Sequence, residues 1–240
     1  MLGLPSWLRI YPSCLAKGRS VEFTSLVLAN VNPSKLRIVE GSDLSENLLL
    51  SQALDYVRGS SKSIIALSNS VLELNLKLPS EPNVLIRYLP NTLGALATVG
   101  LLLDAIPENL PVVVVPINSH ISESIENFIL FMSAQSAAVG MAVIESSSGE
   151  LSYVREVNGK VIEIHEKEVV GKLGITGHYY FANKQLIVDC LHWALLNNIR
   201  KNGLLYIAPS MNYCITKGLN VIPLRVSQKG YKRFDYGSEA

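Results

Sequence analysis

The segment 110–120, Leu-Pro-Val-Val-Val-Val-Pro-Ile-Asn-Ser-His, constrains the fold more than any other part of the sequence. A strand with one face in water alternates apolar and polar side chains, so four consecutive valines predict a strand buried on both faces of a covered sheet. Pro116 has no N–H to give to a neighbouring strand and marks the end of this one. Ligands of open α/β sheets bind outside the carboxyl ends of the strands. We therefore expect Asn118, Ser119 and His120 to border any binding site.

Strand-like and helix-like patterns alternate over the first 145 residues, which predicts a parallel, doubly wound sheet. Asn158-Gly159 between two alternating runs then predicts an antiparallel hairpin. The expected fold is a Rossmann-like, mostly parallel mixed sheet with helices on both faces and an antiparallel hairpin insertion. Residues 1–20 are expected to form an N-terminal arm, and residues 21–240 a single α/β domain. The expected strands are 21–29, 63–68, 83–88, the valine run, 138–145, 153–157, 160–166, 175–181 and 221–225. The expected helices are 47–58, one that opens at the small-residue turn after residue 90 and runs to 103, 122–135, 186–198 and 206–217.

Composition excludes several classes of protein. The formal net charge of +1 argues against a nucleic-acid or membrane-surface protein, which would gather Lys and Arg in clusters. No apolar run approaches the length of a membrane span, and the N-terminus lacks the apolar run of a signal peptide. Cys14, Cys190 and Cys214 are widely spaced, which favours reduced thiols in a cytoplasmic protein. Only 17% of residues are charged and 48% are hydrophobic, so we expect a partner subunit, in a homo-oligomer, to cover part of the surface.

A turn of small residues, Thr92-Leu93-Gly94-Ala95, opens the expected helix that runs to residue 103. Exposed N–H groups at the positive end of a helix can receive polar ligand edges or phosphates. The alternative is that these small residues only allow the helix to pack closely. Spacing alone does not decide between the two.

Five segments in this order resemble the sugar-phosphate nucleotidyltransferases, the nucleotide-sugar pyrophosphorylases. The resemblance extends from about residue 21 to the C-terminus. The segments are the Thr-x-Gly-Ala turn at 92–95, the strand 112–119, the hairpin 151–167 ending in Glu-Lys, the strand 174–181 with Gly-x-Tyr-Tyr-Phe, and the Asp-x-Gly-Ser run at 234–238.

The resemblance implies a reaction in which a sugar 1-phosphate and a nucleoside triphosphate form a nucleotide sugar and pyrophosphate, with Mg²⁺ as cofactor. Such chemistry depends on positioning and on neutralising charge. By resemblance, the turn would contact the base, Glu166 the sugar hydroxyls and Lys167 the sugar phosphate. The other implied positions are Thr92, Gly94 and Ala95 in that turn, Thr176 and Gly177 lining the sugar pocket, Lys35 as a further catalytic cation, and Asn118 and Asp235 at the metal.

Two departures from the family pattern bear on activity. The family has a glycine-rich loop after its first strand, whereas residues 29–37 contain no glycine, which makes it harder for backbone N–H groups to wrap a triphosphate. Asn118 stands where the family has Asp, and an amide oxygen brings Mg²⁺ no negative charge. Lys35 and Arg37 could still supply positive charge, or they are solvated loop cations.

Two functions therefore stay open at the level of the sequence. One is a divergent nucleotidyltransferase-like protein that binds a nucleotide or nucleotide sugar and makes a nucleotide sugar for surface polysaccharide synthesis. The other is a catalytically silent relative with a role in assembly or regulation. A glycosyltransferase on the same type of sheet is a weaker alternative, because the sequence lacks the Asp-x-Asp metal motif on which such enzymes rely.

Overall fold

The valine run forms β4 (Val112–Pro116) in the computed structural model, which describes residues 21–29, 48–74 and 81–234. All four valines are at most 1% exposed, as expected for a strand covered on both faces. The strand ends at Pro116, as predicted from its missing N–H.

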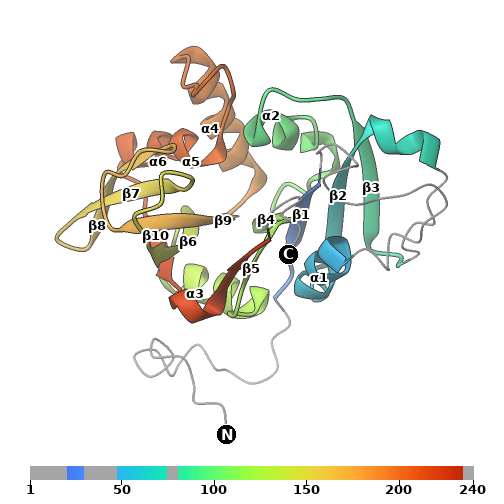
Figure 1. Ribbon diagram of the computed structural model, residues 1–240, viewed down its shortest axis with the longest axis horizontal. Coiled ribbons are helices and arrows are strands. Elements are labelled where there is room, and N and C mark those ends of the chain that lie inside the picture. Colours follow the sequence, from blue (N-terminus) through green and yellow to red (C-terminus); the bar gives the residue numbers. More distant parts are fainter. Residues whose placement is uncertain (1–20, 30–47, 75–80, 235–240) are drawn as a thin grey trace, which may run out of the picture.

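A mixed sheet with β4 near its centre carries the fold (Figure 1). Its seven-strand path runs β10-β6-β9-β4-β1-β2-β3. The neighbours β4–β1, β1–β2, β2–β3 and β6–β10 pair in parallel, whereas β9 is antiparallel to both β4 and β6. The strand bounds are β1 (Thr24–Ala29), β2 (Lys62–Ser68), β3 (Val84–Leu89), β6 (Val139–Glu145), β9 (Leu173–Phe181) and β10 (Val221–Arg225).

The predicted hairpin consists of β7 (Ser152–Val157) and β8 (Lys160–His165), which pair antiparallel. Asn158 and Gly159 form the turn with φ of 52° and 76°, the positive values that a two-residue hairpin turn requires. β7 also pairs with the first half of β9, so the hairpin is attached to the central sheet.

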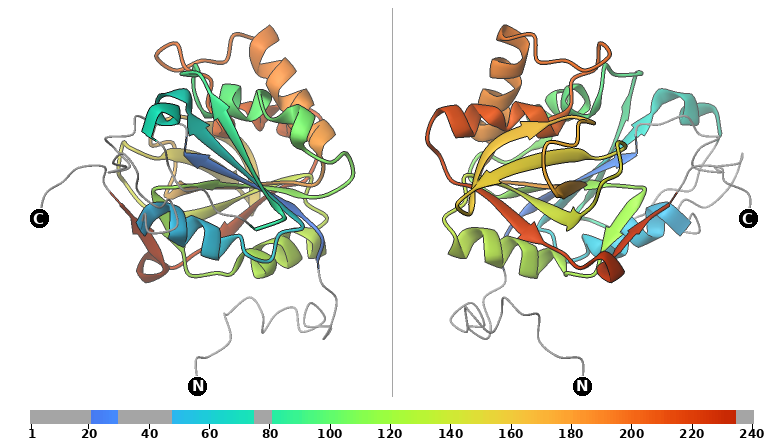
Figure 2. Two further views of the ribbon diagram at one scale, coloured as in Figure 1. Left: turned by 90° about the vertical axis from the view of Figure 1, so that its right-hand side faces the viewer. Right: turned by 60° about the vertical axis from the view of Figure 1, so that its left-hand side comes forward.

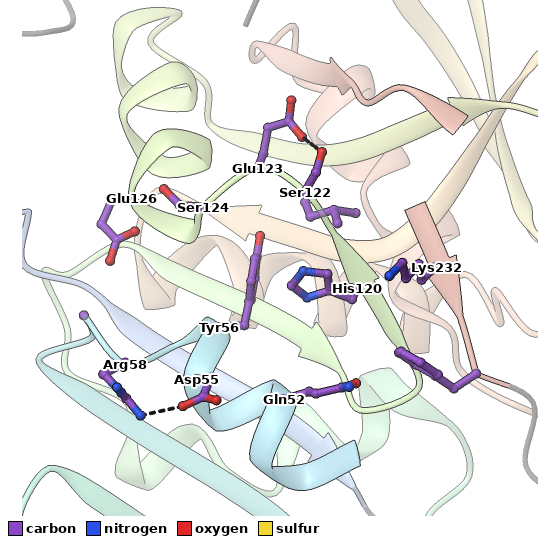
Figure 3. A pocket seen from close by; sticks show the side chains of 13 residues that line it. Gln52, Asp55, Tyr56, Arg58, His120, Ser122, Glu123, Ser124, Glu126 and Lys232 are labelled. Carbon is purple, nitrogen blue, oxygen red and sulfur yellow. Dashed lines mark hydrogen bonds and ion pairs between the residues drawn. The ribbon is translucent and has the colours of Figure 1, made fainter. Parts of the chain in front are cut away.

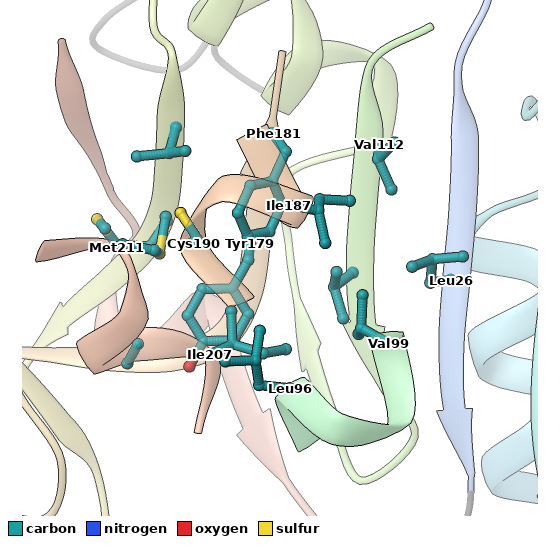
Figure 4. Close-up of a cluster of buried hydrophobic side chains, with 14 of the residues drawn as sticks. Leu26, Leu96, Val99, Val112, Tyr179, Phe181, Ile187, Cys190, Ile207 and Met211 are labelled. Atoms are coloured by element: carbon teal, nitrogen blue, oxygen red, sulfur yellow. The ribbon is translucent and has the colours of Figure 1, made fainter. Parts of the chain in front are cut away.

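Helices cover both faces of the sheet (Figure 2). Alternate side chains of β4 point to opposite faces, so Val112 and Val114 join one core and Val113 and Val115 the other. The first core packs under α2 (Ala95–Gly100), α4 (Lys184–Leu196), α5 (Ile207–Ser210) and α6 (Asn212–Thr216); Figure 4 shows part of it. The second packs against α1 (Leu48–Tyr56) and α3 (Ile125–Ala134). Short 3-10 helices are η5 (Asn69–Leu74), η6 (Leu103–Ala105) and η7 (Gln228–Gly230).

The structure differs from three expectations. The helix expected to run to residue 103 ends at Gly100, and the 3-10 helix η6 follows it. The helix expected over 206–217 is two short helices, α5 and α6, separated at Met211. Pro209 lacks an N–H, and the Asn212 side chain bonds both the N–H and the carbonyl oxygen of Ile164 in β8 (3.0 and 2.8 Å), which favours a break. The antiparallel pair β5 (Ser119–Ile121) and β11 (Tyr231–Arg233) was not expected, because three-residue strands have no readable alternation. Among the described helices, none has the length and apolar character needed to cross a membrane.

Candidate functional site

The turn at 92–95 follows β3 at the carboxyl edge of the parallel sheet, and it is fixed to the chain before α5. Leu205 donates its N–H to the carbonyl oxygen of Leu93 (2.7 Å) and accepts from the N–H of Leu96 (3.1 Å). Gly94 has φ of 106°, and a Cβ there would collide with the carbonyl oxygen of Leu205. Gly94 therefore lets the backbone of Leu205 approach closely, which agrees with the alternative that the small residues allow close packing. The same approach places Tyr206, the next residue, beside the turn.

Lys167, at the end of the β7–β8 hairpin, contacts Tyr206. Lys167 follows β8 with φ of 50°, is exposed, and places its Nζ 5.9 Å from the centroid of the Tyr206 ring. An ammonium over an aromatic face at this distance is held by a cation–π interaction. The end of the hairpin thus meets the segment that is bonded to the turn at 92–95.

Glu166 lies next to Lys167 and is half-buried. Its carboxylate accepts a hydrogen bond from the Ser152 hydroxyl. Burial raises the pKa of Glu166, while the bond from Ser152 and the charges of Lys167 and Lys201 oppose the rise. Glu166 also lines a cavity of about 440 Å³ between β8 and the α5–α6 segment, and this cavity does not include Lys167.

Asn118 lies just beyond the end of β4, beside β9. The neighbouring Ser119 donates its hydroxyl to the carbonyl oxygen of Thr176 (2.8 Å). Gly177 has φ of 93°, and a Cβ there would lie 3.0 Å from Cγ of Pro116. The Thr176 side chain points inward, because it donates to the carbonyl oxygen of Ala142 (3.2 Å) and is 4% exposed.

The proposed metal position is incomplete among the described residues. Asn118 accepts the N–H of Phe234 on its carbonyl oxygen (2.8 Å), which brings the residue before Asp235 beside it. Asp235 itself, like Lys35, lies outside the described residues. Within the described ranges no group of three or more His, Cys, Asp or Glu side chains could hold a metal ion. One neutral amide oxygen does not make a Mg²⁺ site by itself.

The sequence did not indicate Tyr206, Leu205 or Ser152 as parts of this site. Tyr206 and Leu205 sit in a segment that the sequence assigned to a helix or its edge, where an aromatic residue normally signals packing. Ser152 lies at the start of a strand and became relevant only when β7 and β8 paired. None of the three carries a local signal of function.

Comparisons with known proteins bear on the fold. No protein-family model and no curated protein matches the sequence. Solved structures do match the fold. A nucleoside-diphosphate-sugar pyrophosphorylase from Vibrio cholerae RC9 is 18% identical with a TM-score of 0.64, covering 88% of this chain and 95% of that chain. An inositol-1-phosphate CTP transferase from T. maritima is 12% identical with a TM-score of 0.62, covering 92% and 91%. A UDP-glucose pyrophosphorylase complexed with UDP-glucose is 14% identical with a TM-score of 0.64, covering 91% and 94%.

The fold is that of the sugar nucleotidyltransferases.

Within this nucleotidyltransferase fold, the residues that the resemblance singled out fall into three groups. Thr92, Gly94 and Ala95 lie at the end of β3, and Glu166 and Lys167 at the end of β8. Asn118, Thr176 and Gly177 lie where β4 meets β9. The Lys167–Tyr206 contact and the bonds of Leu205 connect the first two groups. The third is held together by the bond from Ser119 to Thr176.

Proposed function

We propose that this chain binds a nucleotide or nucleotide sugar between the turn at 92–95 and the end of the β7–β8 hairpin, and that it transfers a nucleotidyl group to a sugar 1-phosphate. The observation that carries the proposal is the position of Lys167. Its ammonium group lies against Tyr206, which is adjacent to the residue that bonds the turn. A cation at this place would face the phosphates of a ligand whose base rests on the turn.

In the proposed reaction no protein side chain forms a covalent bond with either substrate. An oxygen of the sugar phosphate attacks the α-phosphorus of the triphosphate, a new P–O bond forms, and the bond to the β-phosphate oxygen breaks as pyrophosphate leaves. Lys167 would neutralise charge on the sugar phosphate, and Glu166 would accept hydrogen bonds from sugar hydroxyls. We also propose that the reaction uses Mg²⁺ and that the protein is a homo-oligomer. Its proposed location is the cytoplasm, and its proposed role is surface polysaccharide synthesis.

The second candidate is a catalytically silent member of the same fold with an assembly or regulatory role. The specific observation in its favour is Asn118, a neutral amide at the position where the resemblance calls for a metal-binding carboxylate. An active transferase would also use Lys35 and Asp235, and both belong to segments outside the described residues.

A substitution at Lys167 tests both candidates. Thermal shift with UDP-glucose, CTP and other nucleoside triphosphates and nucleotide sugars, with Mg²⁺, should identify a ligand that stabilises the chain. Lys167→Met should weaken that ligand by about 10- to 100-fold, because one charge-assisted contact is lost. Lys172→Met is the matched control, since Lys172 is also exposed but contributes nothing to the proposed site.

Pyrophosphate release then separates the two candidates. Release from a triphosphate and sugar phosphate pair that Lys167→Met abolishes and Lys172→Met leaves intact supports the transferase. Ligand binding without release supports the silent relative. If no nucleotide or nucleotide sugar stabilises the chain at millimolar concentration, both versions of nucleotide binding are wrong.

A further inference from the structure

A cavity of about 560 Å³ lies between α1, β5 and the start of α3 (Figure 3). It is lined by Phe234, which bonds Asn118, but by no residue of the turn at 92–95 or of the end of the β7–β8 hairpin. Its volume is in the range of small-molecule sites. None of the residues assigned to nucleotide binding lines it. The side chains that matter here are Tyr56 from α1, His120 from β5, Glu123 and Glu126 at the start of α3, and Lys232 from β11.

The Tyr56 hydroxyl has no hydrogen-bond partner among the described residues, although it is shielded from water. The ring is in edge-on contact with His120, with centroids 5.3 Å apart, and with the buried His178, at 5.5 Å. Figure 3 shows the hydroxyl pointing toward the start of α3, between Ser122 and Glu126. A buried hydroxyl without a partner is destabilising, so this one is positioned for a partner that the described chain does not supply.

Charge on the two sides of the cavity differs in sign. Glu123 and Glu126 belong to the segment that the Tyr56 hydroxyl faces, and Lys232 lies on the far side of His120 (Figure 3). The Glu123 carboxylate points away from Tyr56 and accepts the Ser122 hydroxyl at 2.7 Å. Asp55 and Arg58 at the rim pair with each other at 2.5 Å and leave little net charge. Burial and the nearby Lys232 lower the pKa of His120, so this imidazole is neutral at pH 7.

Tyr56 also stays neutral at this pH. Burial, followed by the charges of Glu123 and Glu126, raises the pKa of its phenol. The oxygen therefore keeps its proton and can accept one further hydrogen bond from an ammonium group. An anion in the same place would be repelled by the charges of both carboxylates.

Stabilisation of α3 accounts for the positions of Glu126 and Ser124 but not for the Tyr56 hydroxyl, which has no hydrogen-bond partner among the described residues. Glu126 lies in the first turn of α3, where a carboxylate interacts favourably with the helix dipole, and Ser124 caps the helix by accepting the N–H of Asn127 (3.2 Å). Neither role requires an unpartnered hydroxyl. The Glu126 carboxylate lies against Gly59, in space that a Cβ at this position would occupy unless the flexible Glu126 side chain moved. Glycine at this position lets the carboxylate lie over the end of α1, beside the cavity.

We propose that this cavity binds a small amine whose opposite end is anionic, with the ammonium group near Glu126 and the Tyr56 hydroxyl, where the charge of Glu123 also attracts it, and the anion at Lys232. This site is separate from nucleotide binding and does not depend on it. The ring of Tyr56 and the neutral ring of His120, which are in contact with each other, would pack against one side of the apolar middle of the ligand.

Three probes of equal length test the charge pattern: butylamine, 4-aminobutyrate and butyrate, titrated at pH 7 and followed by thermal shift and by NMR. We expect 4-aminobutyrate to bind more tightly than butylamine, and butyrate not to bind. Binding of butyrate as tight as that of butylamine would overturn the proposal. So would the failure of both amines to bind at tens of millimolar.

Tyr56→Phe separates a ligand-binding role from a structural one. Removing a buried hydroxyl without a partner should leave the free protein as stable as the original or more stable. The same change should weaken 4-aminobutyrate by about five- to tenfold, because one hydrogen bond is lost. A destabilised free protein with unchanged affinity would show that the hydroxyl serves the fold and would contradict the proposal.

Charge variants complete the test. Glu126→Gln should weaken both amines by about tenfold. Lys232→Gln should weaken 4-aminobutyrate and leave butylamine unchanged. Lys229→Gln is the matched control, because Lys229 is exposed nearby in η7 and does not line the cavity. Equal effects of Lys229→Gln and Lys232→Gln would overturn the assignment of Lys232. A nucleotide screen on the same variants stays unaffected, so failure here is distinguishable from failure of the proposed function.

Discussion

Single residues in left-handed backbone conformations set the geometry of the candidate site. Gly94, Lys167 and Gly177 all have positive φ, and each lies where two distant segments meet. Only glycine adopts the φ and ψ of Gly94 (106° and 169°) without strain. Lys167 adopts φ of 50° at a steric cost, and that conformation accompanies its contact with Tyr206.

Gly94→Ala should destabilise the protein more than Gly203→Ala does. Both glycines have positive φ, but a Cβ at Gly94 also collides with the backbone of Leu205, while a Cβ at Gly203 meets nothing within 4 Å. We expect a loss of about 2–4 kcal/mol for Gly94→Ala and about 1 kcal/mol for Gly203→Ala, measured by urea unfolding. Equal losses would mean that the approach of Leu205 to the turn does not constrain Gly94.

Elements begin and end in this protein where local hydrogen bonds allow it. The sequence pattern predicted α4 from residue 186, but the helix begins at Lys184 because Asn183 caps it. The Asn183 side chain accepts the N–H of Leu186 at 3.1 Å, and its extended backbone is typical of a cap. The hairpin β7–β8 turns at Asn158 and Gly159, whose positive φ values suit a two-residue turn.

Asn183→Ala should therefore lower the free energy of unfolding by about 1 kcal/mol, through loss of the cap. Gln185→Ala serves as its control. Gln185 is exposed in the first turn of the same helix and should change stability by less than about 0.5 kcal/mol. Far-UV circular dichroism during urea unfolding measures both. A cap variant as stable as the control would mean that packing of α4 alone fixes its start.

At the scale of the whole molecule, β9 joins the parts that carry the two sides of the candidate site. It pairs with β4, which leads to β1, β2 and β3, and this part of the sheet is here called the nucleotide side. It also pairs with β6 and with β7 of the hairpin, and this part is here called the hairpin side. A sheet continuous through one central strand should unfold as a unit, which is the prediction of a single α/β domain.

A variant with one tryptophan tests that prediction. Trp7→Phe leaves Trp193, in α4, as the only tryptophan. We expect its fluorescence and the far-UV circular dichroism to change at the same urea concentration, because α4 packs on the sheet that contains β9. Two separate transitions would show that the hairpin side and the nucleotide side are independent domains.

The sequence by itself determined the buried central strand, the hairpin turn and most of the strand and helix order, because each depends on side-chain period or on backbone preferences within a few residues. It also identified Gly94 and Lys167 as candidates through the family resemblance. Only the tertiary structure decided that Lys167 meets Tyr206, that β5 pairs with β11, and that Tyr56 contacts two histidines while its hydroxyl has no hydrogen-bond partner among the described residues. These contacts join residues far apart in the chain. Sheet pairing brings such residues together, and the local pattern around each of them is the same whether or not the contact forms.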